Sequence, residues 1–153
     1  MLPPRVAPIQ VVVLPIAQHK PGVIEAAQGL KDRLEKAGVR VKLDDSDKAP
    51  GWKFAEYEMR GVPLRVEIGP KDMEKEQCCI ARRDTGEKAF VPLAELESTV
   101  AKLLDEIHDN MFAMAKKNLE DNTFFADTWE EVRALVEKNS GGFVHTKWCG
   151  SLD

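Results

Sequence analysis

The residues best suited to chemistry lie in one short stretch, residues 50–72, where acids and bases occupy positions that packing does not require. Four of them fall within fourteen positions, near predicted element ends or turns: Glu58, Arg65, Glu67 and Lys71. A carboxylate accepts the N–H donors on a guanine edge, and a cation beside it donates to the O6 and N7 acceptors. The set is therefore one that can read a guanine base, although composition alone favours a solvated charged surface.

Other chemistry finds little support in the sequence. Neither a Walker-type Gly-Lys-Ser/Thr loop nor a Gly-x-Gly-x-x-Gly fingerprint occurs. The three histidines, His19, His108 and His145, are far apart in sequence, and we expect solvated or structural roles for them. His145 and Cys149 stand four residues apart, but a structural zinc site needs four ligands. We therefore expect the chain to fold without zinc.

The predicted elements place the charged stretch inside an α/β sheet. A β-branched run over residues 10–16 is typical of a buried strand. Residues 21–36 have helical spacing, which Gly38 ends, and residues 39–43 alternate as a half-buried strand does. A strand–helix–strand order gives a parallel pair with a right-handed crossover.

The charged stretch begins with a predicted helix over residues 50–60, opened by a proline and closed by Gly61. Phe54 and Glu58 share one face of this helix because they are four residues apart. We expect a different face to pack on the core. The residues predicted on that core face are Trp52, Ala55 and Met59.

The next predicted element is a strand over residues 64–68, whose apolar residues alternate with Arg65 and Glu67. Residues 78–82 and 89–93 then predict a hairpin. We therefore expect a five-stranded mixed sheet flanked by helices.

The rest of the chain predicts two helices and a further strand. Residues 94–120 form the first helix, with a continuous apolar stripe. Its members are Leu96, Val100, Leu103, Ile107, Met111 and Met114. Residues 127–138 form the second helix, with Thr128 as N-cap and Glu131 at the third position, and residues 143–148 resemble a strand.

Length and composition bound the domain count and the compartment. The 153 residues support one domain, or one domain plus a fragment. We predict a first domain over residues 1–108 and, over residues 109–153, a linker helix with an incomplete α+β segment. No apolar run reaches the about 18 residues of a membrane span. Three cysteines, with Cys78 and Cys79 expected to pack in a strand, make no disulfide framework, which favours the cytoplasm.

The charge distribution favours selective over general nucleic-acid binding. A net charge of −4 argues against a general binder of DNA or RNA. The acidity lies at the end of the chain, because residues 94–153 carry six basic and twelve acidic residues. Residues 50–93 carry eight of each, so the charged stretch is neutral and densely charged. This balance suits base reading better than phosphate clamping.

The same stretch resembles prolyl-tRNA synthetase in its archaeal and eukaryotic-like form. The matching motifs are PGWKFAEYEMRGVPLRVEIGPKDME, ARRDTGEK and the opening VAPIQVVVLPI. Three separated motifs in the family's order make the resemblance specific, and it covers the chain from Pro4 to the C-terminus. It implies the anticodon-binding fold of class II synthetases, followed by the beginning of the next domain.

The resemblance also implies roles for individual residues. In that family, this domain reads the two anticodon guanines shared by tRNAs for proline. Glu58 and Arg65 are then the strongest candidates for base contacts. Lys71 and Lys88 are expected to reach bases or the RNA backbone.

Three further candidates come from the same resemblance: Phe54 for base stacking, with Glu67 and Arg82 as supporting residues. The implied partner is tRNA(Pro), and the implied parent is a homodimer that activates proline with ATP and Mg²⁺ in a catalytic domain outside this chain. The family's next domain holds zinc through four cysteines, and Cys149 stands where the first of them is expected.

Two other interpretations remain open. A stand-alone accessory protein of the same fold would use the domain for protein–protein contact or dimerisation. A small flavodoxin-like enzyme would need a phosphate-cradling loop after the first strand, where residues 17–20 read Ala-Gln-His-Lys instead. That sequence argues against the enzyme.

Overall fold

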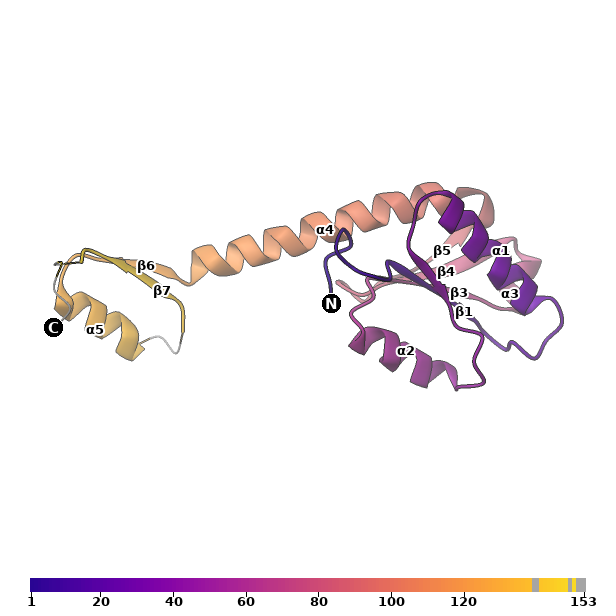
Figure 1. Cartoon of the computed structure of the whole chain (residues 1–153), viewed down its shortest axis with the longest axis horizontal. Coiled ribbons are helices and arrows are strands. Elements are labelled where there is room, and N and C mark those ends of the chain that lie inside the picture. The colour runs from indigo at the N-terminus through magenta and orange to yellow at the C-terminus, as the bar shows by residue number, and fades with distance from the viewer. Residues whose placement is uncertain (139–140, 149, 151–153) are drawn as a thin grey trace. The chain divides into compact units, whose positions relative to one another are not determined.

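The computed structural model describes residues 1–138, 141–148 and 150. Its contacts divide the chain into two compact units, Met1–Met111 and Phe112–Asp153. The division falls within the long helix α4 (Leu96–Asp121), which Figure 1 shows in orange. The zinc-binding character expected of the second part stays a prediction. Within the described residues, no helix combines the length and the apolar character needed to cross a membrane.

A five-stranded mixed sheet forms the first unit, which confirms the predicted α/β fold class. Its strand order is β2-β1-β3-β4-β5. β1 pairs in parallel with β2 and β3, whereas β4 is antiparallel to both β3 and β5. The strands are β1 (Val11–Pro15), β2 (Val41–Leu43), β3 (Leu64–Ile68), β4 (Gln77–Arg82) and β5 (Lys88–Pro92). The predicted parallel pair and the predicted hairpin are both present.

Helices cover both faces of the sheet (Figure 1). α1 (Val23–Lys36) and α4, which follows a short 3-10 turn at Leu93–Glu95, enclose the larger core on one face. α2 (Pro50–Met59) encloses a smaller core on the other face, and α3 (Pro70–Glu74) contacts α1 and β4. The residues of β3 that enter the larger core are Leu64, Val66 and Ile68. The intervening residues of β3 therefore lie on the α2 face, as the alternation predicted.

The apolar stripe predicted on α4 enters the larger core over the first part of the helix. Its members in or against that core are Leu96, Val100, Leu103, Ile107 and Met111. Leu104, which the prediction left out, is buried with them. Met114, the last residue of the stripe, is 61% exposed and lies beyond the end of the first unit.

The core face of α2 differs from the predicted one. The predicted residues are all exposed: Trp52 at 50%, Met59 at 82%, and Ala55. The buried residues of this helix are Lys53 and Tyr57. The apolar pattern missed this face because it counts a lysine as polar, although a lysine stem packs like an aliphatic chain. The Lys53 ammonium donates to the backbone oxygen of Asp44 at 2.9 Å and to Oε1 of Gln18 at 3.2 Å.

A glycine ends α2 and directs the chain into β3. Gly61 has a φ of 77°, a left-handed conformation that glycine adopts at low cost. Its N–H donates to the carbonyl oxygen of Glu58 at 3.1 Å. The N–H of Val62 donates to the carbonyl oxygen of Tyr57 at 3.0 Å, which completes a Schellman motif. Val62 and Tyr57 share the smaller core, so this turn fixes the path from Glu58 on α2 to Arg65 on β3.

The second unit is a small β–α–β arrangement. β6 (Thr123–Ala126) and β7 (Phe143–Thr146) pair in parallel, and α5 (Trp129–Lys138) lies between them in sequence. The N–H of Glu131 donates to Oγ1 of Thr128 at 3.3 Å, and the N–H of Thr128 donates to Oε2 of Glu131 at 3.2 Å. This reciprocal pair confirms the predicted capping box.

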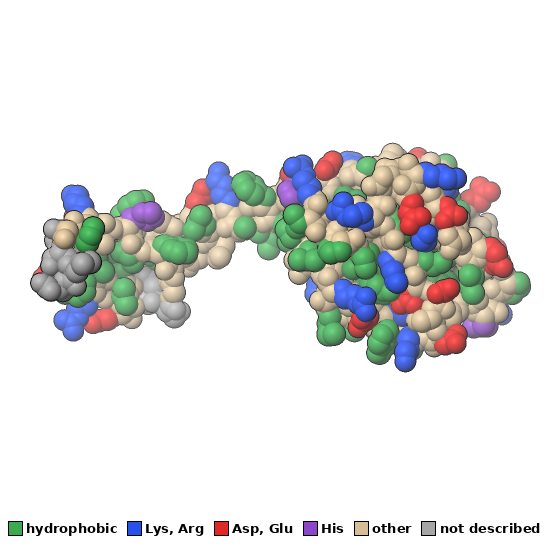
Figure 2. Space-filling view, in the orientation of Figure 1, with side chains coloured by type: hydrophobic (Ala, Val, Ile, Leu, Met, Phe, Trp, Pro, Cys, Tyr) green, Lys and Arg blue, Asp and Glu red, His purple; other side chains and the backbone are tan. Residues whose placement is uncertain are grey.

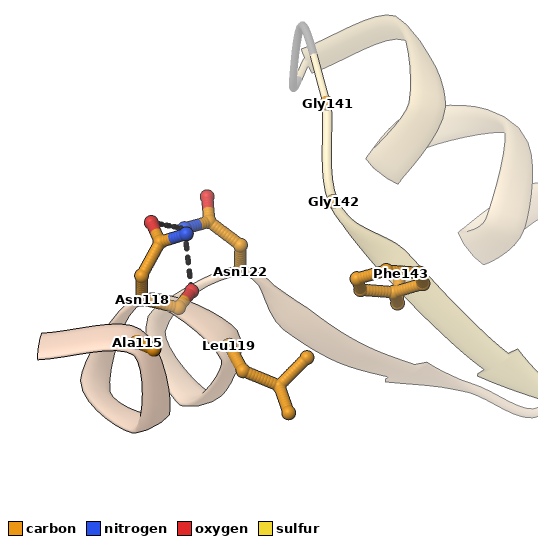
Figure 3. A pocket seen from close by; sticks show the side chains of 7 residues that line it. All are labelled: Ala115, Asn118, Leu119, Asn122, Gly141, Gly142 and Phe143. Atoms are coloured by element: carbon orange, nitrogen blue, oxygen red, sulfur yellow. Dashed lines mark hydrogen bonds between the residues drawn. The ribbon is translucent and has the colours of Figure 1, made fainter. Parts of the chain in front are cut away.

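A glycine at the start of β7 approaches the chain just after α4 within this unit (Figure 3). Gly142 has a φ of 119°, and a Cβ at this position would lie 2.6 Å from the carbonyl oxygen of Asn122. The N–H of Phe143 donates to that same oxygen at 2.8 Å. The side-chain amide of Asn122 donates to the backbone oxygen of Asn118 at 2.7 Å, beside a cavity of about 450 Å³. A side chain at Gly142 would therefore separate β7 from this segment.

We predict that Gly142→Ala destabilises the second unit by about 1–3 kcal/mol, because a strained backbone and a steric conflict coincide there. Hydrogen exchange of the amides in β6 and β7 measures this loss of protection. Gly141→Ala is the matched control, because a Cβ at Gly141 meets nothing within 4 Å. Equal protection in the two variants would contradict the prediction.

Candidate nucleic-acid interface

Arg65 is the centre of a charged cluster on the α2 face of the sheet. Its Nε donates to Oε1 of Glu67 at 2.8 Å, and its Nη1 lies 3.6 Å from Oε1 of Glu58. The guanidinium carbon lies 3.9 Å from the centre of the Phe54 ring, a cation–π contact. The Arg65 side chain is only 14% exposed. Its guanidinium is therefore held by an aromatic face and by two carboxylates.

Lys88 on β5 completes this cluster. Its Nζ lies 3.3 Å from Oε1 of Glu67 and 5.6 Å from the centre of the Phe54 ring. The register explains the meeting, because Ala81 of β4 pairs with Arg65 on one side and with Lys88 on the other. The structure thus brings together five of the seven residues predicted from the sequence: Phe54, Glu58, Arg65, Glu67 and Lys88.

Exposure divides the cluster into an accessible part and a supporting part. The side chains of Glu58 and Lys88 are 45% and 50% exposed, whereas Glu67 is 12% exposed. Glu58 and Lys88 can therefore meet a ligand, while Arg65 and Glu67 hold them in place. Two carboxylates and two cations balance in charge. Figure 2 likewise shows acidic and basic side chains interspersed over the visible face of the first unit, without a patch of one sign.

Arg82 lies on the opposite face of the sheet, because it pairs in register with the core residue Leu64. Its Nη2 donates to Oδ2 of Asp84 at 2.8 Å, and its Nη1 donates to Oε2 of Glu106 on α4 at 3.0 Å. Asn110 also donates to Oδ2 of Asp84 at 2.8 Å. Hydrogen bonds from Arg82, and then from Asn110, hold the pKa of the Asp84 carboxyl below its usual value, although burial opposes them. This network ties the β4–β5 turn to α4.

Lys71, the seventh predicted residue, lies apart from the cluster. It is exposed on α3, directly after the end of β3. Since α3 contacts α1 and β4, the structure does not bring Lys71 to the α2 face.

Phe90 is a residue of the α2 face that the sequence reasoning missed. It is 65% exposed and stands two positions after Lys88 on β5, on the same face of that strand. In register it pairs with Cys79, which pairs in turn with Glu67. In the sequence, strand alternation indicates only that Lys88 and Phe90 share one face of the predicted hairpin. The register is needed to identify that face as the α2 face.

A cavity of about 450 Å³ lies at the carboxyl end of β1, where doubly wound sheets bind their ligands. Residues 14–19 and 47–50 line it together with Lys53. The ammonium of Lys53 faces the backbone oxygen of Asp44 at 2.9 Å, Oε1 of Gln18 at 3.2 Å and Oδ1 of Asp44 at 3.6 Å. Two hydrogen bonds and an ion pair with Asp44 thus hold this buried ammonium, so Lys53 is a structural residue here.

Burial keeps the Tyr57 phenol and the thiols of Cys78 and Cys79 neutral. Burial, with the Asp44 carboxylate nearby, raises the pKa of Tyr57 to about 12, and burial raises the pKa of Cys78 to about 11. Burial also raises the pKa of Cys79. Both cysteines pack in β4 as predicted.

The described residues hold no group of three or more His, Cys, Asp or Glu side chains that could bind a metal. Cys149, the predicted zinc ligand, lies outside them.

Comparison with known proteins gives consistent matches. Residues 10–103 match the family model described as "Anticodon binding domain". The chain is 55% identical over 149 residues to "Proline–tRNA ligase" of Clostridium botulinum (strain 657 / Type Ba4), covering 97% of this chain and 31% of that protein. It is 50% identical over 152 residues to "Proline–tRNA ligase 2" of Bacillus cereus (strain ATCC 14579), covering 99% of this chain and 32% of that protein. The chain thus spans about a third of the length of these relatives.

We predict that Asp84→Asn lowers the free energy of unfolding at neutral pH by about 2 kcal/mol, because it weakens charge-assisted bonds to a buried group. A carboxyl whose pKa is depressed in the folded state stabilises the protein above its unfolded pKa, and this contribution is lost as the pH falls through the folded pKa. Asp84→Asn therefore also flattens the fall in stability below about pH 4. Denaturant unfolding at a series of pH values tests both effects.

The matched control for this experiment is Asp105→Asn, a carboxylate on α4 whose side chain is 76% exposed. It is expected to leave the stability at neutral pH nearly unchanged. The same acid dependence in Asp84→Asn and in the unchanged chain would show that this carboxyl contributes nothing.

Proposed function

The chain belongs to the anticodon-binding domain family and matches the portion of proline–tRNA ligases that carries this domain; from this premise we propose that its α2 face reads guanine bases in the anticodon of a tRNA for proline. One observation carries the proposal. An exposed carboxylate, Glu58, is held beside a fixed guanidinium, Arg65, on a face that also presents an exposed lysine. These are the groups that a guanine edge requires.

Glu58 is the proposed reader of guanine. A carboxylate accepts two hydrogen bonds in parallel, one from guanine N1–H and one from N2–H₂. The contact of Glu58 with Arg65 is long, at 3.6 Å, and leaves its oxygens available for a base. Arg65 acts mainly through Glu58, because the Phe54 ring and Glu67 fix the guanidinium that orients it.

The other predicted residues receive supporting roles in this proposal. Lys88, half exposed, donates to guanine O6 or to a phosphate. Lys71 is exposed and serves the RNA backbone. Arg82 acts at a distance by holding the β4–β5 turn that precedes Lys88. Since the cluster is neutral, its contribution to binding is selectivity more than general affinity.

We also propose that the whole protein is a proline–tRNA ligase. In such an enzyme ATP and Mg²⁺ activate proline in a catalytic domain, and the anticodon-binding domain selects the tRNA. The archaeal and eukaryotic-like type, the homodimer and the zinc-binding domain implied by the resemblance belong to the same proposal. Its support is the 55% identity to a protein named proline–tRNA ligase.

We predict that Glu58→Gln weakens binding of an RNA hairpin with the proline anticodon by about tenfold or more, because each bidentate base contact is worth about 1–3 kcal/mol. An amide can accept one guanine donor but opposes the other with its own N–H. Fluorescence anisotropy with the 153-residue chain measures the affinity. Glu35→Gln is the matched control, since Glu35 is 44% exposed on α1, far in sequence from the cluster.

Replacing each anticodon guanine by inosine identifies the base. Inosine lacks the 2-amino group, so the unchanged chain loses affinity for the substituted RNA, while Glu58→Gln loses little more. Equal affinity of the unchanged chain for hairpins with and without the two guanines would reject base reading and leave a phosphate-binding role.

A further inference from the structure

We propose that Phe90 is a stacking platform for an unpaired RNA base that neighbours the guanine read by Glu58. This inference rests on the proposed function and adds to it a residue that neither the sequence reasoning nor the family match assigns. Phe90 is 65% exposed, and β5, which carries it, is an edge strand of the sheet.

The register of the sheet places Phe90 beside the charged cluster. Cys79 of β4 pairs with Glu67 on one side and with Phe90 on the other, so the three residues form one row across the same face. Adjacent strands lie about 4.8 Å apart, which puts the backbone of Phe90 about 10 Å from that of Glu67. A nucleotide next to one bound at the charged cluster can reach across this distance.

The surroundings of Phe90 suit a base. The residues of β4 between Phe90 and the cluster are Cys79 and Ala81, which are small and nearly buried at 7% and 6% exposure. Lys88 extends across this row to Glu67, so its ammonium lies between the row and the Phe54 ring. The α2 face thus presents two aromatic rings, Phe54 and Phe90, together with a cation from the same strand as Phe90.

This combination separates Phe90 from an ordinary exposed apolar residue. Single exposed apolar side chains are common on protein surfaces and need no explanation. Phe90, however, shares a row with Glu67 of the charged cluster and a strand face with Lys88, whose side chain is half exposed. Flat strand surfaces that carry an aromatic ring beside cations bind unpaired bases by stacking, while the cations meet the phosphates. Anticodon bases are unpaired in a loop, so RNA is the partner that this face fits.

The test measures the affinity of the 153-residue chain for an RNA hairpin that carries the proline anticodon, with 2-aminopurine at the loop positions that flank the guanines. Phe90→Ala is expected to weaken binding about tenfold and to reduce the quenching of 2-aminopurine that stacking causes. Phe90→Leu keeps apolar cover over Cys79 but has no ring, and is expected to lose as much. Phe90→Trp is expected to restore both signals.

Phe112→Ala is the matched control, because Phe112 is equally exposed at 68% but lies on α4. It is expected to bind as the unchanged chain does. Thermal melts check that the Phe90 variants remain folded. Tight binding by Phe90→Ala with unchanged quenching, or full affinity in Phe90→Leu, would overturn the stacking role.

The same experiment separates this inference from the proposed function. When the two guanines are replaced by adenines, Phe90→Ala is expected to lose the same factor, because stacking tolerates any base. Discrimination between the two hairpins by the unchanged chain, together with full affinity in Phe90→Ala, would reject this inference alone. If the unchanged chain bound neither hairpin, and so did not discriminate between them, both this inference and the proposed function would be rejected.

Discussion

The charge of Arg65 is the constraint on which the charged cluster of the α2 face depends. A guanidinium that is only 14% exposed is unfavourable unless it is paired, because burial removes the water that solvates it. The fold supplies the Phe54 ring from α2 and a carboxylate from β3, the strand that carries Arg65 itself. The Nε of Arg65 donates to Oε1 of this carboxylate at 2.8 Å. That carboxylate, Glu67, is itself nearly buried and needs the ammonium of Lys88 from β5. The buried charge of Arg65 therefore ties together residues of α2, β3 and β5.

Local periodicity accounts for the part of this cluster that the sequence could predict. Phe54 and Glu58 share a face because they are one helical turn apart, and Arg65 and Glu67 share a face because they are two residues apart on a strand. Both relations can be read without knowing the fold. Lys88 and Phe90 come from a different strand, so their position depends on the register of the β3–β4–β5 pairing. Lys88 was predicted only from the family resemblance, and Phe90 was not predicted at all.

The failures in the fold have equally specific causes. The buried face of α2 was missed because Lys53 occupies a core position and meets its polar requirement through Asp44 and Gln18. The five-residue α3 and the four-residue β6 are too short for a periodic signal. The five-stranded sheet, by contrast, was predicted correctly because its strands alternate or are continuously apolar. Side-chain pairing across elements, such as Arg82 with Glu106 on α4, has no local signature in a sequence.

A neutral cluster in an acidic chain has a consequence for recognition. Phosphate contacts supply affinity without sequence information, and a strongly basic surface binds any RNA. Here, Arg65 and Lys88 both form ion pairs with Glu67, which partly neutralises them and reduces their attraction for phosphates. An exposed carboxylate such as Glu58 repels phosphate and is compensated only by a base that offers it donors. Under the proposed function, this arrangement penalises RNA without a guanine in the right place, and discrimination would arise from this penalty as much as from the favourable contact.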